Sequence, residues 1–218
     1  MGKEINLLKK YPKSKRDPDQ RSINKSKEII NIAKKFGKEY FDGERIYGYG
    51  GYNYNSKYWE SVVEDFINYY NLNENSKILD IGSGKGFMMY EFLKKIPNIY
   101  IRGLEISEYA ILNSKKEVKE FQILGNAKKL PFENNSFDLA ISIVTLHNLK
   151  KNDCALALQE ISRVSKNSFI TVDAYSNDVE KRQMMNWNLT AETIMHVEDW
   201  KIFFDKNSYN GDYYWFKP

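Results

Sequence analysis

Three alternating glycines and one acid form the clearest chemical signature of the chain, in the stretch Ile78–Phe87 with the sequence Ile-Leu-Asp-Ile-Gly-Ser-Gly-Lys-Gly-Phe. Gly82, Gly84 and Gly86 allow a sharp turn and let a ligand press against bare backbone. Asp80 lies two residues before the first glycine, where a carboxylate can hold an ammonium group. The third glycine comes one residue earlier than in the dinucleotide fingerprint G-x-G-x-x-G, which favours another ligand. A strand-to-helix turn without a ligand is the alternative interpretation.

Polar groups also follow the next two predicted strands. Glu105 comes nineteen residues after Gly86, and its carboxylate can accept hydrogen bonds from both ribose hydroxyls of an adenosine. Asn126 can bond an adenine amino group, and the backbone N–H of Ala127 can reach a ring nitrogen. Three loops in chain order thus offer groups for an amino-acid end, a ribose and a base. Lys85, inside the glycine loop, is expected to point to solvent.

Alternating strand and helix signals predict the elements that position these loops. Apolar runs predict strands at 77–81, 99–105, 121–124, 137–144, 168–173 and 212–216. Helical spacing predicts helices at 86–95, 107–115, 153–164, 179–188 and 197–205. Such alternation implies a parallel sheet with helices on both faces, and ligands bind such sheets outside the carboxyl ends of the strands.

Composition limits the possible classes of protein. The 218 residues are 42% hydrophobic, enough for one domain with a sizeable core. The single cysteine, Cys154, excludes an internal disulfide and fits a reducing compartment. No apolar run approaches the roughly 20 residues needed to span a bilayer, and no signal-peptide core is present, so we expect a soluble, cytoplasmic protein. The net charge of +4 permits an anionic partner without requiring nucleic acid. No metal site is expected.

The N-terminal third differs from the rest of the chain. Residues 1–27 are basic and polar, which favours a solvated, partly disordered arm over a binding role. Its positive charges include Lys9, Lys10, Lys13, Lys15 and Arg16. Helices are expected at 26–40 and 59–70. Between them, residues 43–55 carry tyrosines among glycines. Tyrosine has a flat apolar face and a polar tip, which suits a loop that closes over a ligand, although simple packing on the core is equally open.

Taken together, these motifs resemble the class I methyltransferases that use S-adenosyl-L-methionine (SAM). The resemblance rests on residues 79–87, 103–107, 125–138 and 159–164. It covers about residues 76–175 and departs from the family in two small ways. Asn126 replaces a frequent Asp, which still allows a bond to adenine, and Ser83 replaces a frequent Cys or Ala. The flanks at 47–52, 180–191 and 211–216 resemble a narrower group of small bacterial methyltransferases associated with capsule or surface-polysaccharide modification.

This resemblance implies a cofactor, a product and a set of contacts. SAM would be the methyl donor and S-adenosyl-L-homocysteine (SAH) the product. The implied SAM ligands are Asp80, Gly82, Glu105, Asn126 and Ala127, and the wider expected set adds Ser83, Gly84, Gly86, Ile106 and Ile143. In this family the segment before the first strand usually covers the cofactor. Tyr47, Tyr49 and Tyr52 are therefore expected to form a lid, with Arg45 pairing with the SAM carboxylate.

Candidate acceptor-side residues follow the fourth and fifth strands. His147 ends an apolar run, and an imidazole that titrates near neutrality can act as a general base. Asp173 ends the fifth strand and can orient the acceptor or His147. A loop histidine that bonds backbone and an aspartate that caps a turn are the alternatives. Asn148, Tyr175 and His196 are the expected substrate contacts, with structural packing as their alternative.

We therefore predict an α/β protein with a Rossmann-like, doubly wound, mostly parallel sheet of six or seven strands. Residues 1–75 would form a basic arm and a helical, tyrosine-rich N-terminal cap, and residues 76–218 the SAM-binding core. The expected activity is methyl transfer to a small polar acceptor, such as a sugar- or phosphate-bearing capsule precursor. A homodimer built on the aromatic tail is compatible with the sequence.

Three other functions remain open. An RNA methyltransferase would use the basic arm, but no Asn-Pro-Pro-Tyr-like motif for a flipped base follows the fourth strand, so nucleic acid is disfavoured. A SAM-binding subunit without transfer activity is the non-enzyme alternative. A nicotinamide enzyme is disfavoured by the glycine spacing.

Overall fold

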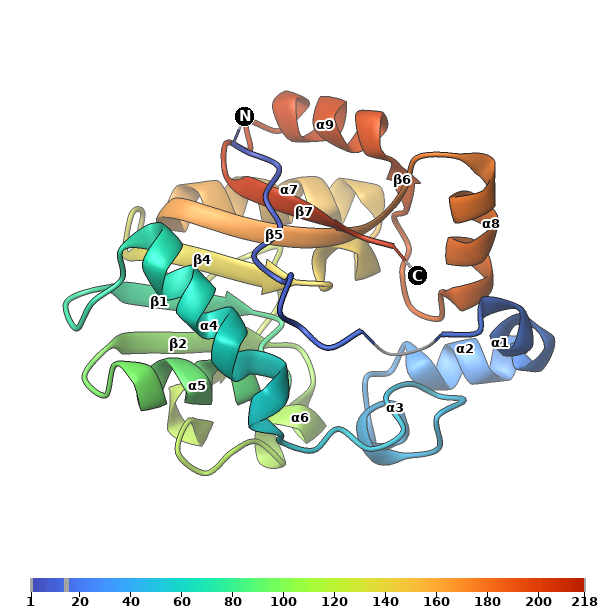
Figure 1. Ribbon diagram of the computed structural model, residues 1–218, viewed down its shortest axis with the longest axis horizontal. Helices are drawn as coiled ribbons and strands as arrows, with labels where there is room; N and C mark the ends of the chain where they lie inside the picture. Colours follow the sequence, from blue (N-terminus) through green and yellow to red (C-terminus); the bar gives the residue numbers. More distant parts are fainter. Residues whose placement is uncertain (1, 14–15, 218) are drawn as a thin grey trace.

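The computed structural model describes residues 2–13 and 16–217. Its centre is a seven-stranded sheet with the order β3-β2-β1-β4-β5-β6, in which β7 pairs with β5. The strands are β1 (Lys77–Ile81), β2 (Tyr100–Glu105), β3 (Gln122–Leu124), β4 (Phe137–Ile143), β5 (Ser165–Tyr175), β6 (Met195–His196) and β7 (Asp212–Phe216). Every pairing is parallel (Figure 1). The predicted α/β fold is confirmed, and the strand bounds agree with the prediction within a few residues.

Nine α-helices and two short 3₁₀ turns accompany the sheet in the described residues. The α-helices are α1 (Pro18–Asn24), α2 (Lys27–Ala33), α3 (Lys38–Asp42), α4 (Ser56–Tyr70), α5 (Phe87–Lys95), α6 (Glu108–Leu112), α7 (Lys151–Val164), α8 (Asp178–Trp187) and α9 (Val197–Lys206). The turns are η1 (Lys119–Phe121) and η2 (Leu146–Asn148).

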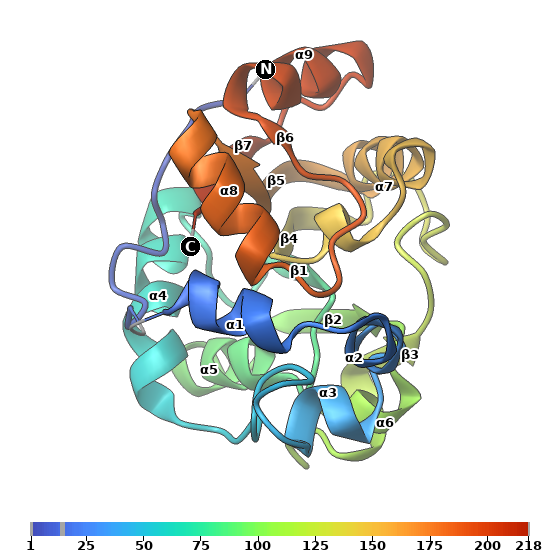
Figure 2. The ribbon, with the colours of Figure 1, turned by 90° about the vertical axis from the view of Figure 1, so that its right-hand side faces the viewer.

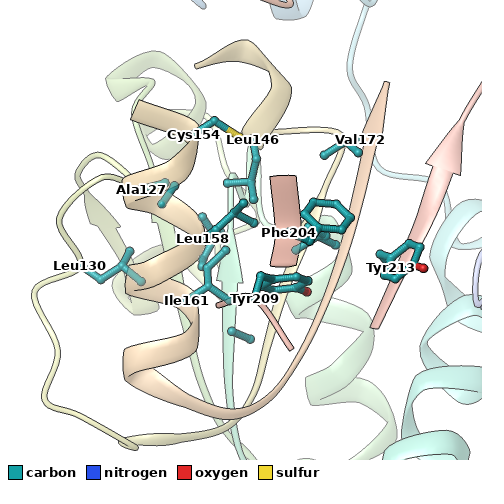
Figure 3. Close-up of a cluster of buried hydrophobic side chains, with 14 of the residues drawn as sticks. Ala127, Leu130, Leu146, Cys154, Leu158, Ile161, Val172, Phe204, Tyr209 and Tyr213 are labelled. Atoms are coloured by element: carbon teal, nitrogen blue, oxygen red, sulfur yellow. The ribbon is translucent and has the colours of Figure 1, made fainter. Parts of the chain in front are cut away.

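Two hydrophobic clusters cover the two faces of the sheet. Successive side chains of a strand point to opposite faces. In β5, Ile170 and Val172 accordingly join the cluster with α7 and α9, whereas Phe169 joins the cluster with α4 and α5. Figure 3 shows the first cluster, where Leu158 of α7 and Phe204 of α9 pack together. The sheet is therefore buried on both faces, which leaves the carboxyl ends of its strands as the place for a site.

Helices from both ends of the chain cover those carboxyl ends. Figures 1 and 2 show α1, α2 and α3 together with α8 beyond the tips of β1 and β4. Helix α1 packs directly against α8, so the N-terminal cap and the C-terminal tail meet above the sheet.

The prediction of a solvated N-terminal arm is wrong for the described residues 2–13 and 16–27. The Ile5 N–H donates to the Tyr213 carbonyl at 2.9 Å, and Leu7 is only 5% exposed. The Tyr11 ring lies 5.0 Å from that of Trp59 in α4. Lys15 of the predicted basic arm lies outside the described residues. The prediction was based on the polar composition of the arm. In the structure, the apolar residues Leu7 and Tyr11 and the pairing with β7 hold the arm in place.

The single helix predicted at 26–40 is also wrong, because it is divided into α2 and α3. Phe36 adopts a left-handed backbone with φ of 49°, and Gly37 is the N-cap of α3. A non-glycine residue with positive φ ends regular helix geometry, so the chain turns between the two helices.

Candidate functional site

The glycine loop joins β1 to α5 and has a backbone that other residues cannot adopt easily. Gly82, Gly84 and Gly86 have φ values of +81°, +54° and +72°. A Cβ at Gly82 would lie 2.1 Å from Thr145 Oγ1, and one at Gly86 would lie 2.5 Å from Val118 Cγ2. The loop therefore requires glycine for its dihedral angles and also for the close approach of neighbouring side chains.

Gln122, at the start of β3, fixes the same loop and was not predicted. Its side-chain amide donates to Ser83 Oγ at 2.9 Å and to the Gly84 carbonyl at 2.8 Å. Ser83 thus turns its hydroxyl toward the protein interior. No local sequence motif predicts this role, because Gln122 lies 38 residues after Gly84, whose carbonyl accepts its hydrogen bond.

Two buried acids lie beside the loop. Asp80 is 5% exposed and Glu105 is 6% exposed. Burial and the charge of Glu105 raise the pKa of Asp80 to about 7. Burial also raises the pKa of Glu105, although N–H groups of Ser107 and Gly84 donate to its carboxylate and oppose that shift. Among the described residues, no Lys or Arg forms an ion pair with either acid. Two such carboxylates fit a ligand that carries a positive charge.

The groups expected around an adenosine also lie together at these strand ends. Ile106 follows Glu105 directly and is 53% exposed, so its apolar side chain is free to contact a ring. Asn126 Oδ1 accepts from the Lys128 N–H at 3.0 Å, which holds the loop after β3, and Ala127 is buried there. Ile143 packs at the end of β4. These residues fit SAM, and their individual roles in binding stay predictions.

Aromatic side chains from the N-terminal cap cover the glycine loop. The Tyr52 ring stacks on that of Phe87 with centroids 4.8 Å apart, and it lies 4.4 Å from the Tyr49 ring. One Tyr52 ring carbon lies 3.5 Å from the position of a Cβ on Gly84, next to a ring carbon of Phe41. Burial, and after it the charges of Tyr11, Asp80 and Glu105, raise the pKa of Tyr52. This placement supports the lid prediction for Tyr49 and Tyr52.

The prediction that Lys85 points to solvent is wrong. Lys85 is 5% exposed, and its ammonium group lies 2.6 Å from Asp42 Oδ2 and 2.9 Å from the Tyr52 carbonyl. Asp42 also accepts from the Tyr109 hydroxyl at 2.7 Å and from the Tyr52 N–H at 3.1 Å. Asp42 therefore connects the glycine loop, the lid and α6 through one carboxylate, which sequence reasoning missed.

Arg45 is placed away from its predicted partner. Its guanidinium donates to the Gly48 carbonyl and lies 5.5 Å from the centroid of the Trp187 ring. The structure thus puts Arg45 in a group of arginines around Trp187, a placement that does not support pairing with the SAM carboxylate. Tyr47 is half-buried in the same loop, where its N–H donates to the Glu44 carbonyl at 3.0 Å.

His147 lies in η2, and its geometry argues against the base role. It is 4% exposed, and its Nδ1 accepts a hydrogen bond from the Asp173 N–H at 3.0 Å. Burial lowers the pKa of His147 to about 3. A neutral imidazole whose Nδ1 accepts must carry its proton on Nε2 and has no free lone pair for an acceptor. His147 is therefore suited to position Asp173 or to donate a hydrogen bond.

Asp173, at the carboxyl end of β5, has the properties expected of a base. It is 5% exposed, and its Oδ1 is buried without a hydrogen-bond partner in the described structure. Burial raises the pKa of Asp173 to about 7, and the charge of Arg16 opposes that shift. The Trp200 indole N–H donates to the Asp173 carbonyl at 2.9 Å, which fixes the backbone here. A carboxylate with a pKa near the working pH is an effective proton acceptor.

The three predicted substrate contacts differ in their surroundings. Asn148 has a buried side-chain oxygen without a hydrogen-bond partner in the described structure, so its predicted role stays open. Tyr175 packs against the His196 ring with centroids 5.7 Å apart. The prediction for His196 is not supported. Its Nδ1 accepts from the Glu198 N–H at 3.2 Å as the N-cap of α9, and its Nε2 lies 3.0 Å from the Ser176 carbonyl.

Comparisons with known proteins agree with this site. A family model described as a methyltransferase domain matches residues 79–170. The mitochondrial arginine-hydroxylase NDUFAF5 of Mus musculus is 34% identical over 97 residues, or 44% of this chain and 27% of that protein. The ubiquinone/menaquinone biosynthesis C-methyltransferase UbiE of Rickettsia prowazekii is 36% identical over 105 residues, or 43% of this chain and 42% of that protein. The matches thus span less than half the length of these two relatives.

A solved structure extends the comparison to the fold. The crystal structure of the YcgJ protein from Bacillus subtilis is 20% identical and superposes with a TM-score of 0.55 over 66% of each chain. The family model thus identifies residues 79–170 as a methyltransferase domain, and the superposition agrees with it in fold; such a domain implies SAM as the methyl donor and SAH as the product. None of the helices in the described residues is both long and apolar enough to cross a bilayer.

Proposed function

We propose that the protein transfers the methyl group of SAM to a small polar acceptor held at the carboxyl ends of β4 and β5. The observation that carries this proposal is the pair of buried acids, Asp80 and Glu105, beside a strained glycine loop and beneath aromatic side chains. Buried carboxylates without a basic partner are costly unless a cationic ligand compensates them, and SAM carries an ammonium and a sulfonium group.

Each part of the chain has a separate task in this proposal. SAM supplies an electrophilic methyl group when it is bound. Asp80, Glu105 and the glycine loop hold it, and Tyr49 and Tyr52 exclude water from above. Asp173 accepts the proton when the acceptor is a hydroxyl, and His147 positions Asp173 through the hydrogen bond at Nδ1. The acceptor must be aligned to within about 3–3.5 Å of the methyl group for in-line attack.

The proposed class of methyl acceptor is inferred from the lid and not from the relatives. The relatives named above are a hydroxylase of arginine and a methyltransferase of quinone biosynthesis, so their names give no common acceptor. The aromatic lid favours a small molecule over a large one. A sugar- or phosphate-bearing precursor of a surface glycan, made in the cytoplasm, stays the specific prediction, and its support is the resemblance of the flanking segments.

Calorimetric titration with SAH and a methyl-transfer assay test this function. Wild-type protein should bind SAH with micromolar affinity and transfer labelled methyl from SAM to a component of a polar metabolite extract. Asp80→Asn should weaken SAH binding at least about tenfold, because the ammonium loses its charged partner. Asp199→Asn, an exposed acid in α9, is the matched control and should bind normally. Absence of SAH binding in folded wild-type protein would refute the proposal.

A further inference from the structure

A pocket lies between the N-terminal cap and α8. It is a cavity of about 330 Å³, at the small end of the range for ligand pockets, roughly 300–1,000 Å³. Figure 2 shows α1, α2 and α8 around this region, in front of the ends of β1 and β4. The charged residues that line it are Arg16, Arg21, Lys25, Arg45 and Asp17. Four positive groups therefore face one carboxylate.

Three of the arginines gather around one aromatic ring. The guanidinium carbons of Arg16, Arg21 and Arg45 lie 5.3, 4.5 and 5.5 Å from the centroid of Trp187. Cation–π contacts stabilise each guanidinium on the ring. They do not neutralise the three like charges, which still repel one another.

The bonding of these residues shows which charges are available to a ligand. None of the three arginines forms an ion pair with a carboxylate in the described parts of the chain. Arg16 Nε and Arg21 Nε are buried and have no hydrogen-bond partner there. Lys25 is different, because its ammonium donates to the Met185 and Asn188 carbonyls at the end of α8.

The remaining acid does not neutralise the cluster. Asp17 Oδ1 accepts from the Gln20 N–H at 2.9 Å as the N-cap of α1, and the residue is exposed. Burial and the charge of Arg45 lower the pKa of Arg21 to about 10, and the same two causes lower the pKa of Arg16. Arg16 and Arg21 are partly buried and Arg45 is exposed, and neighbouring cations of this kind are stabilised when an anion binds among them.

Arg16 connects this pocket to the reacting end of the sheet. Its guanidinium carbon lies 4.3 Å from the centroid of Phe216 at the end of β7, beside β5. Phe216 is the register partner of Asp173 in β5, so Arg16 lies beside the strand end that carries Asp173, and its charge opposes the rise in the pKa of that carboxyl. A molecule with its anionic group among the arginines would extend toward Asp173.

We propose that this pocket binds the phosphate group of a small phosphorylated acceptor and presents its hydroxyl to Asp173. The inference rests on the proposed function, because it names the class of acceptor for the same site. Phosphate suits the cluster better than a carboxylate does. A phosphate monoester carries close to two negative charges and has three oxygens for the forked donors of three guanidiniums.

Direct titration with inorganic phosphate tests the site without the donor or the acceptor. At constant ionic strength, phosphate should bind wild-type protein in the millimolar range or tighter. Arg21→Gln should weaken binding about tenfold or more, and Arg45→Gln should act in the same direction. Arg182→Gln removes an exposed arginine of α8 outside the pocket and should leave binding unchanged. Equal binding of acetate, or equal loss in Arg182→Gln, would overturn the assignment.

The methyl acceptor can then be tested separately from SAH binding. Pre-treatment of a polar metabolite extract with phosphatase should abolish methyl incorporation by the wild-type enzyme. Incorporation that survives phosphatase would overturn the phosphorylated acceptor but leave the methyltransferase function intact. Phosphate binding without SAH binding would instead refute the proposed function and leave the anion site standing. SAH affinity of Arg21→Gln should equal that of the wild type.

Discussion

Asp80 and Asp173 end two different strands and share one property, a buried carboxyl whose pKa is raised to about 7. The causes differ in part. Burial and the charge of Glu105 both raise the pKa of Asp80. Burial also raises the pKa of Asp173, but the charge of Arg16 lowers it. Both groups therefore change protonation near neutral pH, and each should control a separate step that can be measured.

Donor binding should depend on pH through Asp80. Its ionised form holds the ligand ammonium, and the free protein is increasingly protonated below pH 7. SAH affinity should therefore be nearly constant above pH 7.5 and fall up to about tenfold per unit below pH 6.5. Asp80→Asn should bind weakly without that slope. Calorimetry from pH 5.5 to 8.5 measures it, and a flat wild-type profile would contradict the role of Asp80.

Proton removal should depend on Asp173 and not on His147. Asp173→Asn should lower kcat by about 10²–10⁴-fold while SAH affinity stays unchanged. His147→Asn keeps an acceptor near the Asp173 N–H and should lower kcat by less than about tenfold. The wild-type kcat/KM should rise with pH through about 7, because the base must be ionised. If His147→Asn is as slow as Asp173→Asn, then His147 is the base.

Strand-end spacing sufficed to predict that Asp80, Glu105 and Asp173 lie near the carboxyl ends of their strands, and their roles stay predictions. It failed for Lys85, whose partner Asp42 lies 43 residues earlier in the chain. A lysine among glycines resembles a solvated one unless the acid that buries it is known. His147 shows a similar limit, since the sequence cannot reveal which ring nitrogen the backbone occupies.

At the scale of elements, the lid depends on the connection between α3 and the glycine loop. Asp42 ends α3 and holds Lys85, Tyr109 and the Tyr52 N–H at once. The lid rings above Gly84 are therefore anchored by a charge pair that is largely shielded from water. This arrangement predicts that a substitution at Asp42, which is not a predicted SAM contact, changes how fast the cofactor dissociates.

Asp42→Asn should loosen the lid and preserve the fold. The amide keeps the shape of the side chain but removes the ion pair with the buried Lys85. SAH should bind about 3–10-fold more weakly, mainly through faster dissociation, since related interfaces differ chiefly in off-rate. Glu39→Gln, an exposed change on the same helix, serves as the control. Unchanged dissociation in stopped-flow fluorescence would show that the lid does not retain the cofactor.

The strands and the helices of the core were predictable because their periodicity is set by burial on both faces. The arm was not predictable in the same way, because its order comes from distant contacts. Tyr11 packs against Trp59, and Ile5 pairs with Tyr213. Local composition does not reveal such distant partners. For that reason the basic residues 1–27 were predicted to form a solvated arm.

Across the whole molecule, the positive charges of the arm are drawn into the arginine pocket and onto the surface of the core. Lys10 pairs with Asp65 of α4, and Arg16 and Arg21 line the cavity with Trp187. Arg16 and Arg21 are gathered in a small cavity and not spread along an open surface, which suits a small anion better than a polynucleotide. The cavity is lined by residues 16–46 and 187–189, which are far apart in the chain, so no local motif predicts it.

RNA affinity should accordingly be weak. A fluorescently labelled single-stranded RNA should show no binding tighter than about 10 μM at 150 mM salt, compared with the 10⁻⁴–10⁻⁶ M typical of nonspecific nucleic-acid binding. Fluorescence anisotropy over a salt series measures this. Submicromolar binding with a steep salt slope would favour the RNA methyltransferase alternative. The predicted homodimer stays a separate question for sedimentation analysis.

The edge formed by β7 gives the order in which the parts of this protein become functional. Residues 3–5 bond to β7, and Arg16 lies against Phe216, so the arm docks on a strand that is synthesised much later than the arm itself. Ribosomes add about 5–20 residues per second, so the arm waits roughly ten seconds or longer for its partner. The glycine loop and β1 to β4 emerge well before that. A nascent chain can thus acquire its donor site first, and recognition of the acceptor is completed only after synthesis reaches β7.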